Sequence, residues 1–240
     1  MVMAKPITSD PATTIERPPD CELEIEQPAK GYRYNQDPFH LVQFINDHTE
    51  QWQAQLKGNC LDLGCGVGIL PLLLARTLPD TRFTGIEIQD ELARLASANV
   101  KRNQLSEQIK IIHADYRDMC REASGHERFQ SIICNPPYYS MTSGRINPCP
   151  QKRIARHEQT TNPENLTRAA AYFLSRKGLF ITLFPAERLL ELTTHLKAAK
   201  LEPKHLRFIH PENSDRASML LLAARKNGAP GIIIDKPLTI

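Results

Sequence analysis

No stretch of this 240-residue sequence approaches the ~20 uncharged apolar residues that a membrane-spanning helix needs. Residues 1–20 contain prolines and threonines, but they lack the apolar block of a signal peptide. We therefore expect a cytoplasmic protein with no membrane partner. A disordered tail is expected over residues 1–20, a single domain with one buried core over residues 21–227, and a second tail over residues 228–240.

The sequence also lacks any Cys-x-x-Cys pair, a spacing typical of zinc sites. Of its six cysteines, four lie in or beside apolar runs, where a free thiol usually packs in the core: Cys60, Cys65, Cys120 and Cys134. Cys149 and His157 fall in one loop, but two isolated ligands do not close a metal site. We expect free thiols, no metal and a monomer.

Acidic residues are scarce in the last hundred positions. Residues 141–240 contain 16 Lys and Arg against 8 Asp and Glu, whereas residues 1–140 contain 14 against 19. The net charge of +3 is thus divided into +8 and −5. A basic half beside an acidic one favours a polyanionic partner over one face, although a solvated charged surface gives the same counts.

After Gly58 the sequence alternates short apolar runs with longer amphipathic ones, which is typical of strand–helix–strand units around a parallel sheet. Strands are predicted near 60–63, 82–88, 109–113, 129–134 and 179–184, and helices near 69–78, 90–103, 163–174 and 186–199. Residues 206–210 and 218–224 have no helix-length segment between them, which predicts an antiparallel pair. The expected fold class is α/β, with a Rossmann-like, seven-stranded, mostly parallel sheet and an antiparallel C-terminal strand.

Two elements are predicted before this sheet. Residues 21–34 alternate at period two around a Pro-Ala-Lys-Gly turn, which indicates a hairpin. Asp37 followed by Pro38 is a typical cap and first residue of a helix, with a buried face that includes Phe39 and Leu41. Farther along, Asn162 is the predicted cap of the helix that starts at Pro163.

The run Asp62-Leu63-Gly64-Cys65-Gly66-Val67-Gly68 lies between a predicted strand and a predicted helix. Glycines lack a Cβ and tolerate positive φ, so such a run brings the backbone close to a ligand. Ile69 stands where a dinucleotide fingerprint has Gly or Ala, which disfavours a nicotinamide cofactor. We expect this run to hold a nucleoside cofactor of another kind.

Acidic residues follow the next two predicted strands. Glu87 comes 19 positions after Gly68, where a carboxylate can accept hydrogen bonds from both ribose hydroxyls, and Ile88 would flank the adenine. Asp115 is placed to accept from the adenine amine. Each residue alone is also explained as a turn or a helix cap, but their occurrence at successive strand ends favours a binding site.

The fourth predicted strand ends in Asn135-Pro136-Pro137-Tyr138, 67 positions after Gly68. The side-chain oxygen of Asn135 and the carbonyl of Pro136 can accept both hydrogens of an exocyclic amine, which stabilises a nitrogen that becomes positive. The prolines restrict φ, and Tyr138 offers a ring for stacking. A rigid turn is the alternative. Together with the glycine run, the motif indicates a methyl donor pocket and a methyl acceptor pocket without a side-chain base.

The segment from 139 to 159 has no apolar periodicity and is expected to form a loop that contacts phosphate. Its predicted RNA-binding residues are Arg145, Lys152, Arg153, Arg156 and His157. A base inside a folded strand does not reach such a pocket, so the substrate base must be looped out or single-stranded. A surface loop without a partner is the alternative.

The Asp-x-Gly-x-Gly-x-Gly run, Gly-Ile-Glu and Asn-Pro-Pro-Tyr resemble the motifs of class I S-adenosylmethionine-dependent methyltransferases of amino groups. Residues 27–34 (Gln-Pro-Ala-Lys-Gly-Tyr-Arg-Tyr), 155–158 (Ala-Arg-His-Glu) and 214–226 are similar to those of the tRNA1(Val) (adenine-N6)-methyltransferase family, over about residues 21–227. The resemblance implies S-adenosyl-L-methionine as cofactor, a tRNA substrate, and methylation of N6 of the adenine beside the anticodon of a valine tRNA.

The resemblance also brings the segment from Lys30 to Asp37 to the cofactor. The expected cofactor site is then Lys30, Gly31, Tyr34, Asp37, Asp62, Gly64, Cys65, Gly66, Gly68, Glu87, Ile88, Asp115, Tyr116 and Asn135. The expected catalytic residues are Asn135, Pro136, Pro137 and Tyr138.

Two other functions fit the same motifs. Asn-Pro-Pro-Tyr also occurs in enzymes that methylate DNA adenine, ribosomal RNA or a protein glutamine, although the basic C-terminal half argues against a peptide substrate. A non-catalytic RNA-binding protein that holds the cofactor is the second alternative, and the intact run from Asn135 to Tyr138 argues against it.

Overall fold

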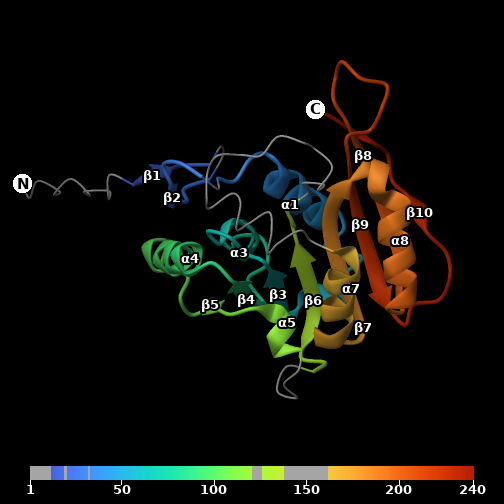
Figure 1. The fold of residues 1–240 in the computed structure, drawn as a ribbon, viewed down its shortest axis with the longest axis horizontal. Coiled ribbons are helices and arrows are strands. Elements are labelled where there is room, and N and C mark those ends of the chain that lie inside the picture. The colour runs from blue at the N-terminus through green and yellow to red at the C-terminus, as the bar shows by residue number, and fades with distance from the viewer. Residues whose placement is uncertain (1–11, 19–20, 32, 121–125, 138–161) are drawn as a thin grey trace, which may run out of the picture.

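The computed structural model describes residues 12–18, 21–31, 33–120, 126–137 and 162–240 (Figure 1). Its main feature within these residues is a nine-stranded sheet. The strands are β3 (Gly58–Leu63), β4 (Thr81–Glu87), β5 (Ile109–His113), β6 (Phe129–Cys134), β7 (Leu174–Pro185), β8 (Leu201–His210), β9 (Met219–Lys226), β10 (Ile233–Ile234) and β11 (Leu238–Thr239). They lie in the order β10-β8-β9-β7-β6-β3-β4-β5, and β11 also pairs with β8.

The pairing of the central strands is mostly parallel. β3 pairs in parallel with β4 and β6, β4 with β5, and β6 with β7, whereas β9 runs antiparallel to both β7 and β8. The predicted seven-stranded core with one antiparallel C-terminal strand is therefore confirmed. Because β3 to β6 are parallel, their carboxyl ends meet at one edge of the sheet.

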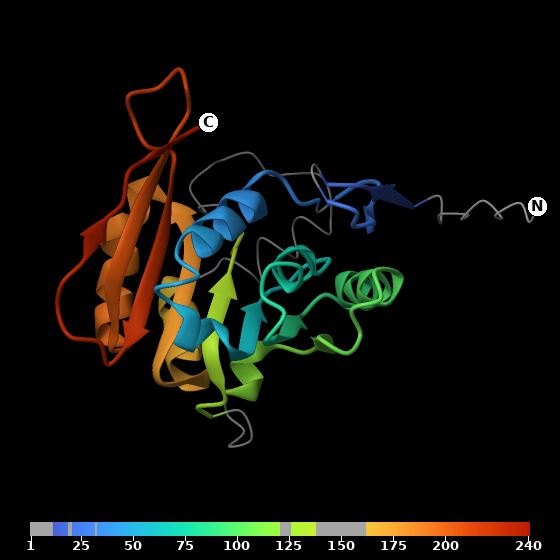
Figure 2. The same ribbon diagram turned by 180° about the vertical axis from the view of Figure 1, so that it is seen from behind.

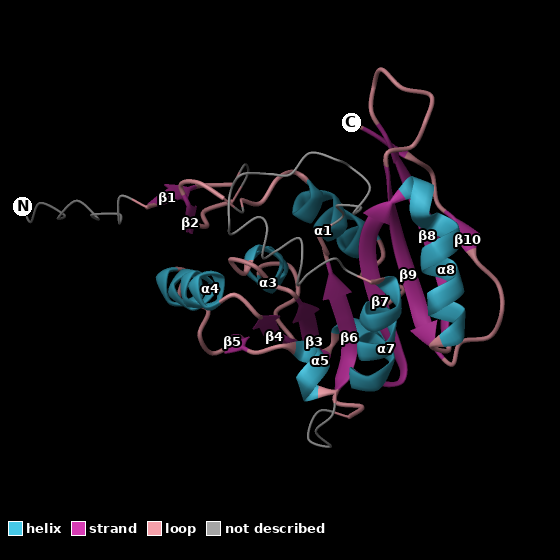
Figure 3. Ribbon diagram, in the orientation of Figure 1, coloured by secondary structure: helices cyan, strands magenta, loops and turns pink. Residues whose placement is uncertain are grey.

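Helices cover both faces of the sheet. The helices on one face are α1 (Asp37–Asp47), α2 (Gln53–Leu56), α3 (Ile69–Ala75) and α4 (Asp90–Arg102), and those on the other are α5 (Tyr116–Met119), α7 (Pro163–Phe173) and α8 (Leu189–Ala198). Figure 3 shows α7 and α8 in front of the strands, and Figure 2 shows α1 and α3 in front of them from behind. The predicted cap of α7 is confirmed, since the Asn162 side chain accepts from the Glu164 N–H at 2.9 Å. The predicted cap of α1 is displaced by one residue, because the helix begins at Asp37 and Gln36 is its cap.

The strands divide the core into two clusters. Leu61 and Leu63 of β3 pack toward α7 and α8, and Cys60 packs toward α1 and α3, as the period of two along a strand requires. Strands that are covered on both faces have apolar residues at nearly every position, so they can be located in the sequence as apolar runs. Only glycine fits at position 85 in β4, since a Cβ there would lie 2.8 Å from the Cys65 sulfur.

The predicted N-terminal hairpin pairs differently from the expectation. β2 (Ile25–Pro28) pairs antiparallel with β1 (Thr13–Glu16), not with residues near Tyr34. Cross-strand side chains reinforce this pairing, because Thr13 Oγ1 donates to Glu26 and Gln27 donates to Glu16, both at 2.7 Å. β1 thus lies in the stretch expected as a tail, and β10 and β11 lie in the expected C-terminal tail. The domain boundaries themselves stay a prediction.

Two asparagines of α4 attach the hairpin to the sheet domain. Asn99, fully buried, accepts from the Glu26 N–H at 2.7 Å and donates to the carbonyls of Glu26 at 2.8 Å and Val67 at 3.0 Å. Asn103 exchanges two further hydrogen bonds with the backbone of Glu24. The N-terminal segment is therefore held above α4 and beside the glycine turn (Figure 1).

Candidate active site

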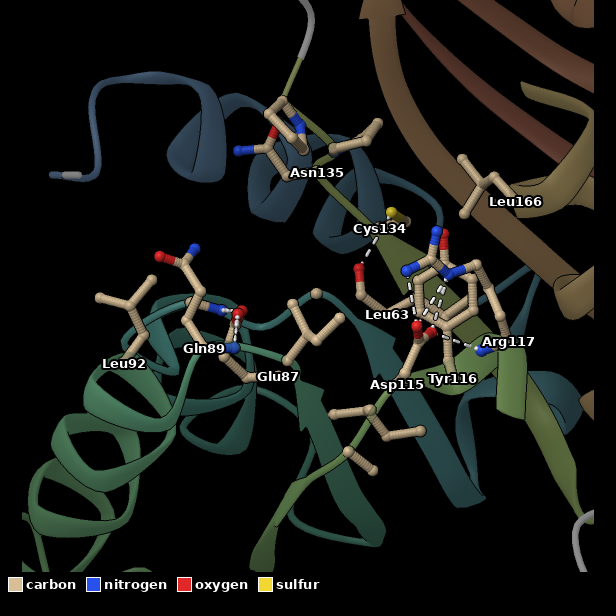
Figure 4. A pocket seen from close by; sticks show the side chains of 17 residues that line it. Leu63, Glu87, Gln89, Leu92, Asp115, Tyr116, Arg117, Cys134, Asn135 and Leu166 are labelled. Atoms are coloured by element: carbon tan, nitrogen blue, oxygen red, sulfur yellow. Dashed lines mark hydrogen bonds and ion pairs between the residues drawn. The ribbon is translucent and has the colours of Figure 1, made fainter. Parts of the chain in front are cut away.

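A pocket lies at the carboxyl edge of the sheet, between the ends of β3, β4, β5 and β6 (Figure 4). About 650 Å³ of empty space lies between its walls, part of it open to solvent. Its lining residues are Leu63, Gly64, Gly66, Ile86, Glu87, Ile88, Gln89, Leu92, Ala114, Asp115, Tyr116, Arg117, Cys134, Asn135, Pro136, Pro137 and Leu166. The motifs predicted separately along the sequence thus share one cavity.

The glycine turn supplies the floor of the pocket. Gly64 and Gly66 line it and have φ angles of 76° and 56°, in the left-handed region that favours glycine. A Cβ on Gly64 would meet nothing within 4 Å, so the backbone here faces open space. The N–H groups of Gly64 and Cys65 both donate to the Ile86 carbonyl, at 2.9 and 3.0 Å, which fixes the turn against β4.

Glu87 is held by the turn that it supports. The side chain is 2% exposed, and its carboxylate accepts from the N–H groups of Gly66 and Gln89, each at 2.9 Å. A carboxylate has about four lone-pair positions, so two such bonds leave acceptor capacity for a diol. The carboxylate is therefore oriented by backbone groups before any ligand binds.

Asp62 has a contrasting environment. It is 1% exposed, and neither carboxylate oxygen has a hydrogen-bond partner among the residues that the structure describes. Burial, and then the nearby Glu87 charge, raise the pKa of Asp62 well above its usual range. A buried carboxyl without a partner is costly, so this position fits a cationic group that arrives with a ligand.

Asp115 lies in the pocket and also caps α5. Its side chain accepts from the Arg117 N–H at 2.8 Å and from the Arg117 guanidinium at 2.5 to 2.9 Å. This hydrogen-bonded pair raises the pKa of Arg117. The sequence allowed Asp115 to be either a helix cap or a pocket residue, and in the structure it is both.

The end of β6 forms the opposite rim of the pocket. Asn135 lies across the open middle from Glu87 and Gln89 (Figure 4). The preceding residue, Cys134, is hydrogen-bonded to both neighbouring strands. Its Sγ donates to the Leu63 carbonyl of β3 at 3.1 Å, and its carbonyl accepts from Thr182 Oγ1 of β7 at 3.0 Å. Burial raises the pKa of Cys134, so this thiol is a packing group. The strand end that presents Asn135 is thereby fixed in place.

Several predicted site residues do not line the pocket. Asp62, Cys65 and Gly68 are buried and do not line it, and neither do Lys30, Gly31, Tyr34 and Asp37. The Tyr34 N–H donates to the Gln27 side chain at 3.2 Å, which folds this segment onto the hairpin. Burial, and then Glu16, raise the pKa of Tyr34 to about 12. Tyr138 and the five predicted RNA-binding residues lie outside the described residues.

Other lining residues were not predicted, among them Gln89, Leu92 and Arg117. Arg117 had a local signal, since it lies two positions after Asp115 and reaches back to it. Leu92 and Leu166 carried no signal that separates them from core residues, because each belongs to the apolar face of a helix.

The comparisons with known proteins agree with this geometry. The family model of the methyltransferase small domain matches residues 45–182. A solved structure titled a predicted O-methyltransferase from Agrobacterium tumefaciens superposes with a TM-score of 0.60 at 20% identity, covering 75% of this chain and 79% of the other. None of the described helices is long and apolar enough to span a membrane. The family match and the strand order define a Rossmann-like methyltransferase.

Relatives named tRNA1(Val) (adenine(37)-N6)-methyltransferase include two that align over most of their length. The one from Porphyromonas gingivalis is 35% identical over 186 residues, which cover 77% of this chain and 71% of the relative. The one from Pedobacter heparinus is 27% identical over 209 residues, which cover 87% of this chain and 84% of the relative. The chain belongs to this family of tRNA adenine-N6 methyltransferases.

Proposed function

We propose that this chain transfers the methyl group of S-adenosyl-L-methionine to the N6 amine of an adenine in tRNA, and that the adenine is the one beside the anticodon of a valine tRNA. The observation that carries the proposal is the meeting of Asn135-Pro136-Pro137 with Glu87 and the glycine turn in one pocket. Membership of the family supports the tRNA substrate and the N6 position.

The residues present fit the cofactor. Glu87 would accept from the ribose hydroxyls, while Ile88 and Tyr116 would flank the adenine and Asp115 would accept from its amine. Asp62, two residues before Gly64, fits the ammonium group of the methionine part, because its buried carboxylate lacks a partner among the described residues. The bound cofactor supplies an electrophilic methyl group on a sulfonium.

Asn135 and Pro136 would act on the methyl acceptor. The lone pair of an exocyclic amine is delocalised into the ring, so the nitrogen attacks only as it becomes tetrahedral and positive. The Asn135 side-chain oxygen and the Pro136 carbonyl would each accept one amine hydrogen, and these bonds strengthen as charge develops. The proton then leaves to water, so no side-chain base is required.

Alignment contributes more than the two acceptor bonds. Two hydrogen bonds to a developing charge are worth about 3–6 kcal/mol together, whereas placing nitrogen, methyl and sulfur in line is worth about 7–11 kcal/mol. The backbone bonds that fix Glu87 and the tie between Cys134 and Leu63 hold both sides of the pocket in register. Rigid placement is therefore the main catalytic device in this proposal.

We further propose that the enzyme acts as a cytoplasmic monomer and that the basic residues between 139 and 159 contact the tRNA backbone. Binding through phosphates predicts weaker affinity at higher salt, with a slope set by the number of contacts.

The test is transfer of labelled methyl groups to total tRNA, followed by identification of the modified nucleoside and its position by mass spectrometry. N6-methyladenosine is expected next to the anticodon of valine tRNA. Asn135→Ala should lower the transfer rate by at least ~100-fold, as for loss of one group that stabilises a transition state, with cofactor affinity nearly unchanged.

Asn59→Ala is the matched control, because Asn59 is an exposed residue of β3 outside the pocket. It should transfer methyl groups like the parent. Transfer to DNA or to a protein glutamine but not to tRNA would contradict the substrate, and cofactor binding without any transfer would favour the non-catalytic alternative.

A further inference from the structure

Three metal-ligating side chains converge far from the pocket. His48 follows α1, His205 is in β8, and Asp235 directly follows β10. One ligating atom from each lies within 4.8 Å of the other two. We propose that His48, His205 and Asp235 bind a divalent transition metal, zinc in particular, as a structural site that fastens the C-terminal segment to α1.

The spacing of these atoms suits a tetrahedral ion. Asp235 Oδ2 lies 3.3 Å from His48 Nε2 and 3.5 Å from His205 Nδ1. Ligands at ~2.0–2.1 Å from a tetrahedral zinc are separated by about 3.3 Å. Both distances exceed those of strong charge-assisted hydrogen bonds, which are ~2.7–2.9 Å. Two of the three separations thus match those around an ion, and the third, between the histidine nitrogens, is at most 4.8 Å.

The hydrogen bonding of His48 is compatible with a bound metal. Its Nδ1 lies 2.8 Å from the Phe44 carbonyl, so Nδ1 carries the hydrogen and donates it. In the neutral ring Nε2 then has a lone pair, and this lone pair faces the Asp235 carboxylate. Either a proton on Nε2 or a bound metal ion satisfies both atoms, and titration with a metal distinguishes the two. A carbonyl bonded to the second ring nitrogen is also the usual support of a metal-ligating histidine.

Two of the three ligating atoms have no other use. Within the described part of the chain, His205 Nδ1 and Asp235 Oδ2 are buried and form no hydrogen bond of good geometry, and their contacts are the long ones within this trio. His205 is only 5% exposed, and buried polar atoms of this kind are normally satisfied.

The surroundings provide a shell and an entrance. The Trp52 ring stacks on His48 with centroids 4.4 Å apart and also contacts His205 edge-on. His205 and Trp52 line a pocket of about 750 Å³ that opens to solvent, so an ion has a path. Lys204 lines the same pocket, but its amine is engaged by the carbonyls of Ala229 and Gly231 at 3.0 and 2.7 Å.

The bound ion would secure a weakly held segment. β10 and β11 each contribute only two residues to pairing with β8, and Ile233 and Ile234 are about half exposed. Asp235 is the ligand from this segment, whereas His48 and His205 belong to the domain. We expected no metal from the sequence, where the three ligands come from distant elements and form no local motif, and this proposal departs from that expectation.

The experiment titrates the full chain, freed of metal by a chelator, with Co²⁺ and then with Zn²⁺. We expect one equivalent of Co²⁺ with the visible bands of a tetrahedral site of nitrogen and oxygen ligands and without thiolate charge-transfer bands, and displacement of Co²⁺ by Zn²⁺. Zinc at a hundredfold excess over Kd should raise Tm by roughly 5–10 °C and slow proteolysis within residues 228–240.

Asp235→Asn and His205→Gln should each lower the affinity by more than the ~10–100-fold typical of outer-shell partners. Asp215→Asn, exposed, and His210→Gln, in the same strand as His205, are the matched controls and should bind like the parent. The proposal is overturned by a parent that binds no Co²⁺, by thiolate bands, or by unchanged binding in Asp235→Asn. The parent titration stands on its own where a variant does not fold, and methyl transfer is measured separately.

Discussion

Glu87 and Asp62 are two buried carboxylates at the ends of neighbouring strands, and their environments differ sharply. Glu87 accepts from two backbone N–H groups, whereas neither oxygen of Asp62 has a hydrogen-bond partner in the described part of the chain. Their exposed fractions are nearly equal, at 2% and 1%. Burial alone therefore does not assign a role: Glu87 orders the glycine turn through its two hydrogen bonds, whereas the role proposed for Asp62 is to bind a cationic group of the ligand.

The largest effect is expected for Glu87→Ala. The variant loses the acceptor of the Gly66 N–H and both proposed ribose bonds, each worth about 1.5–3 kcal/mol to a charged group, so affinity for S-adenosylhomocysteine should fall at least ~100-fold. Calorimetry measures this. Glu107→Ala, an exposed glutamate before β5, is the control, and a Glu87→Ala variant that binds within threefold of the parent, roughly 0.6 kcal/mol, would refute the role.

Asp62→Asn should change stability and affinity in opposite directions. Removing a buried, unpaired carboxyl should raise the free energy of unfolding of the free protein by about 1–3 kcal/mol at pH 7.5. Loss of a charged bond to the cofactor ammonium should weaken binding by about 10- to 100-fold. Urea unfolding and calorimetry on one preparation give both values. A variant less stable than the parent would mean that Asp62 is satisfied in solution.

The difference in free energy of unfolding between the parent and Asp62→Asn should also depend on pH. Because the pKa of Asp62 is raised in the folded state, the native protein keeps a proton that the unfolded chain loses above about pH 3.9, so this group's contribution to stability falls as pH rises toward the raised pKa. Asp62→Asn lacks this decline. Its advantage over the parent should therefore grow as pH rises above about 3.9, the pKa of Asp in the unfolded chain, and continue to grow toward the raised folded-state pKa. Urea unfolding at several pH values tests this, and a constant difference would show that the Asp62 pKa is not raised.

The smallest effect concerns the third carboxylate, Asp115, which Arg117 already neutralises. Asp115→Ala should weaken S-adenosylhomocysteine by only about 3- to 10-fold, the value of one ordinary hydrogen bond. The sharper readout is S-inosylhomocysteine, which has an oxygen in place of the adenine amine. The parent should prefer the adenine compound and the variant should not; equal discrimination by both proteins would remove Asp115 from adenine recognition.

The sequence predicted the elements that repeat a simple period and missed those that depend on partners. β3 to β9 are long apolar or alternating runs, so each was located within a few residues. β1 was missed because its pairing with β2 depends on side-chain bonds such as Thr13 to Glu26.

The candidate site was predictable for the same kind of reason. Gly64, Glu87, Asp115 and Asn135 follow successive strands, and parallel strands bring their ends together. The pairing of Arg117 with Asp115 and the isolation of Asp62 were not predictable, because they depend on side-chain directions. His48, His205 and Asp235 come together only after α1, β8 and the segment after β10 have packed, so their proximity could not be read from the sequence.

Asn99 ties the hairpin and the glycine turn to one amide group. Deleting the first 28 residues would remove two of its partners at once, leaving one N–H and the amide oxygen of Asn99 unpaired next to the Val67 peptide. Shortened forms of this enzyme would therefore lose order in the cofactor turn, even though no described residue of the deleted segment lines the pocket.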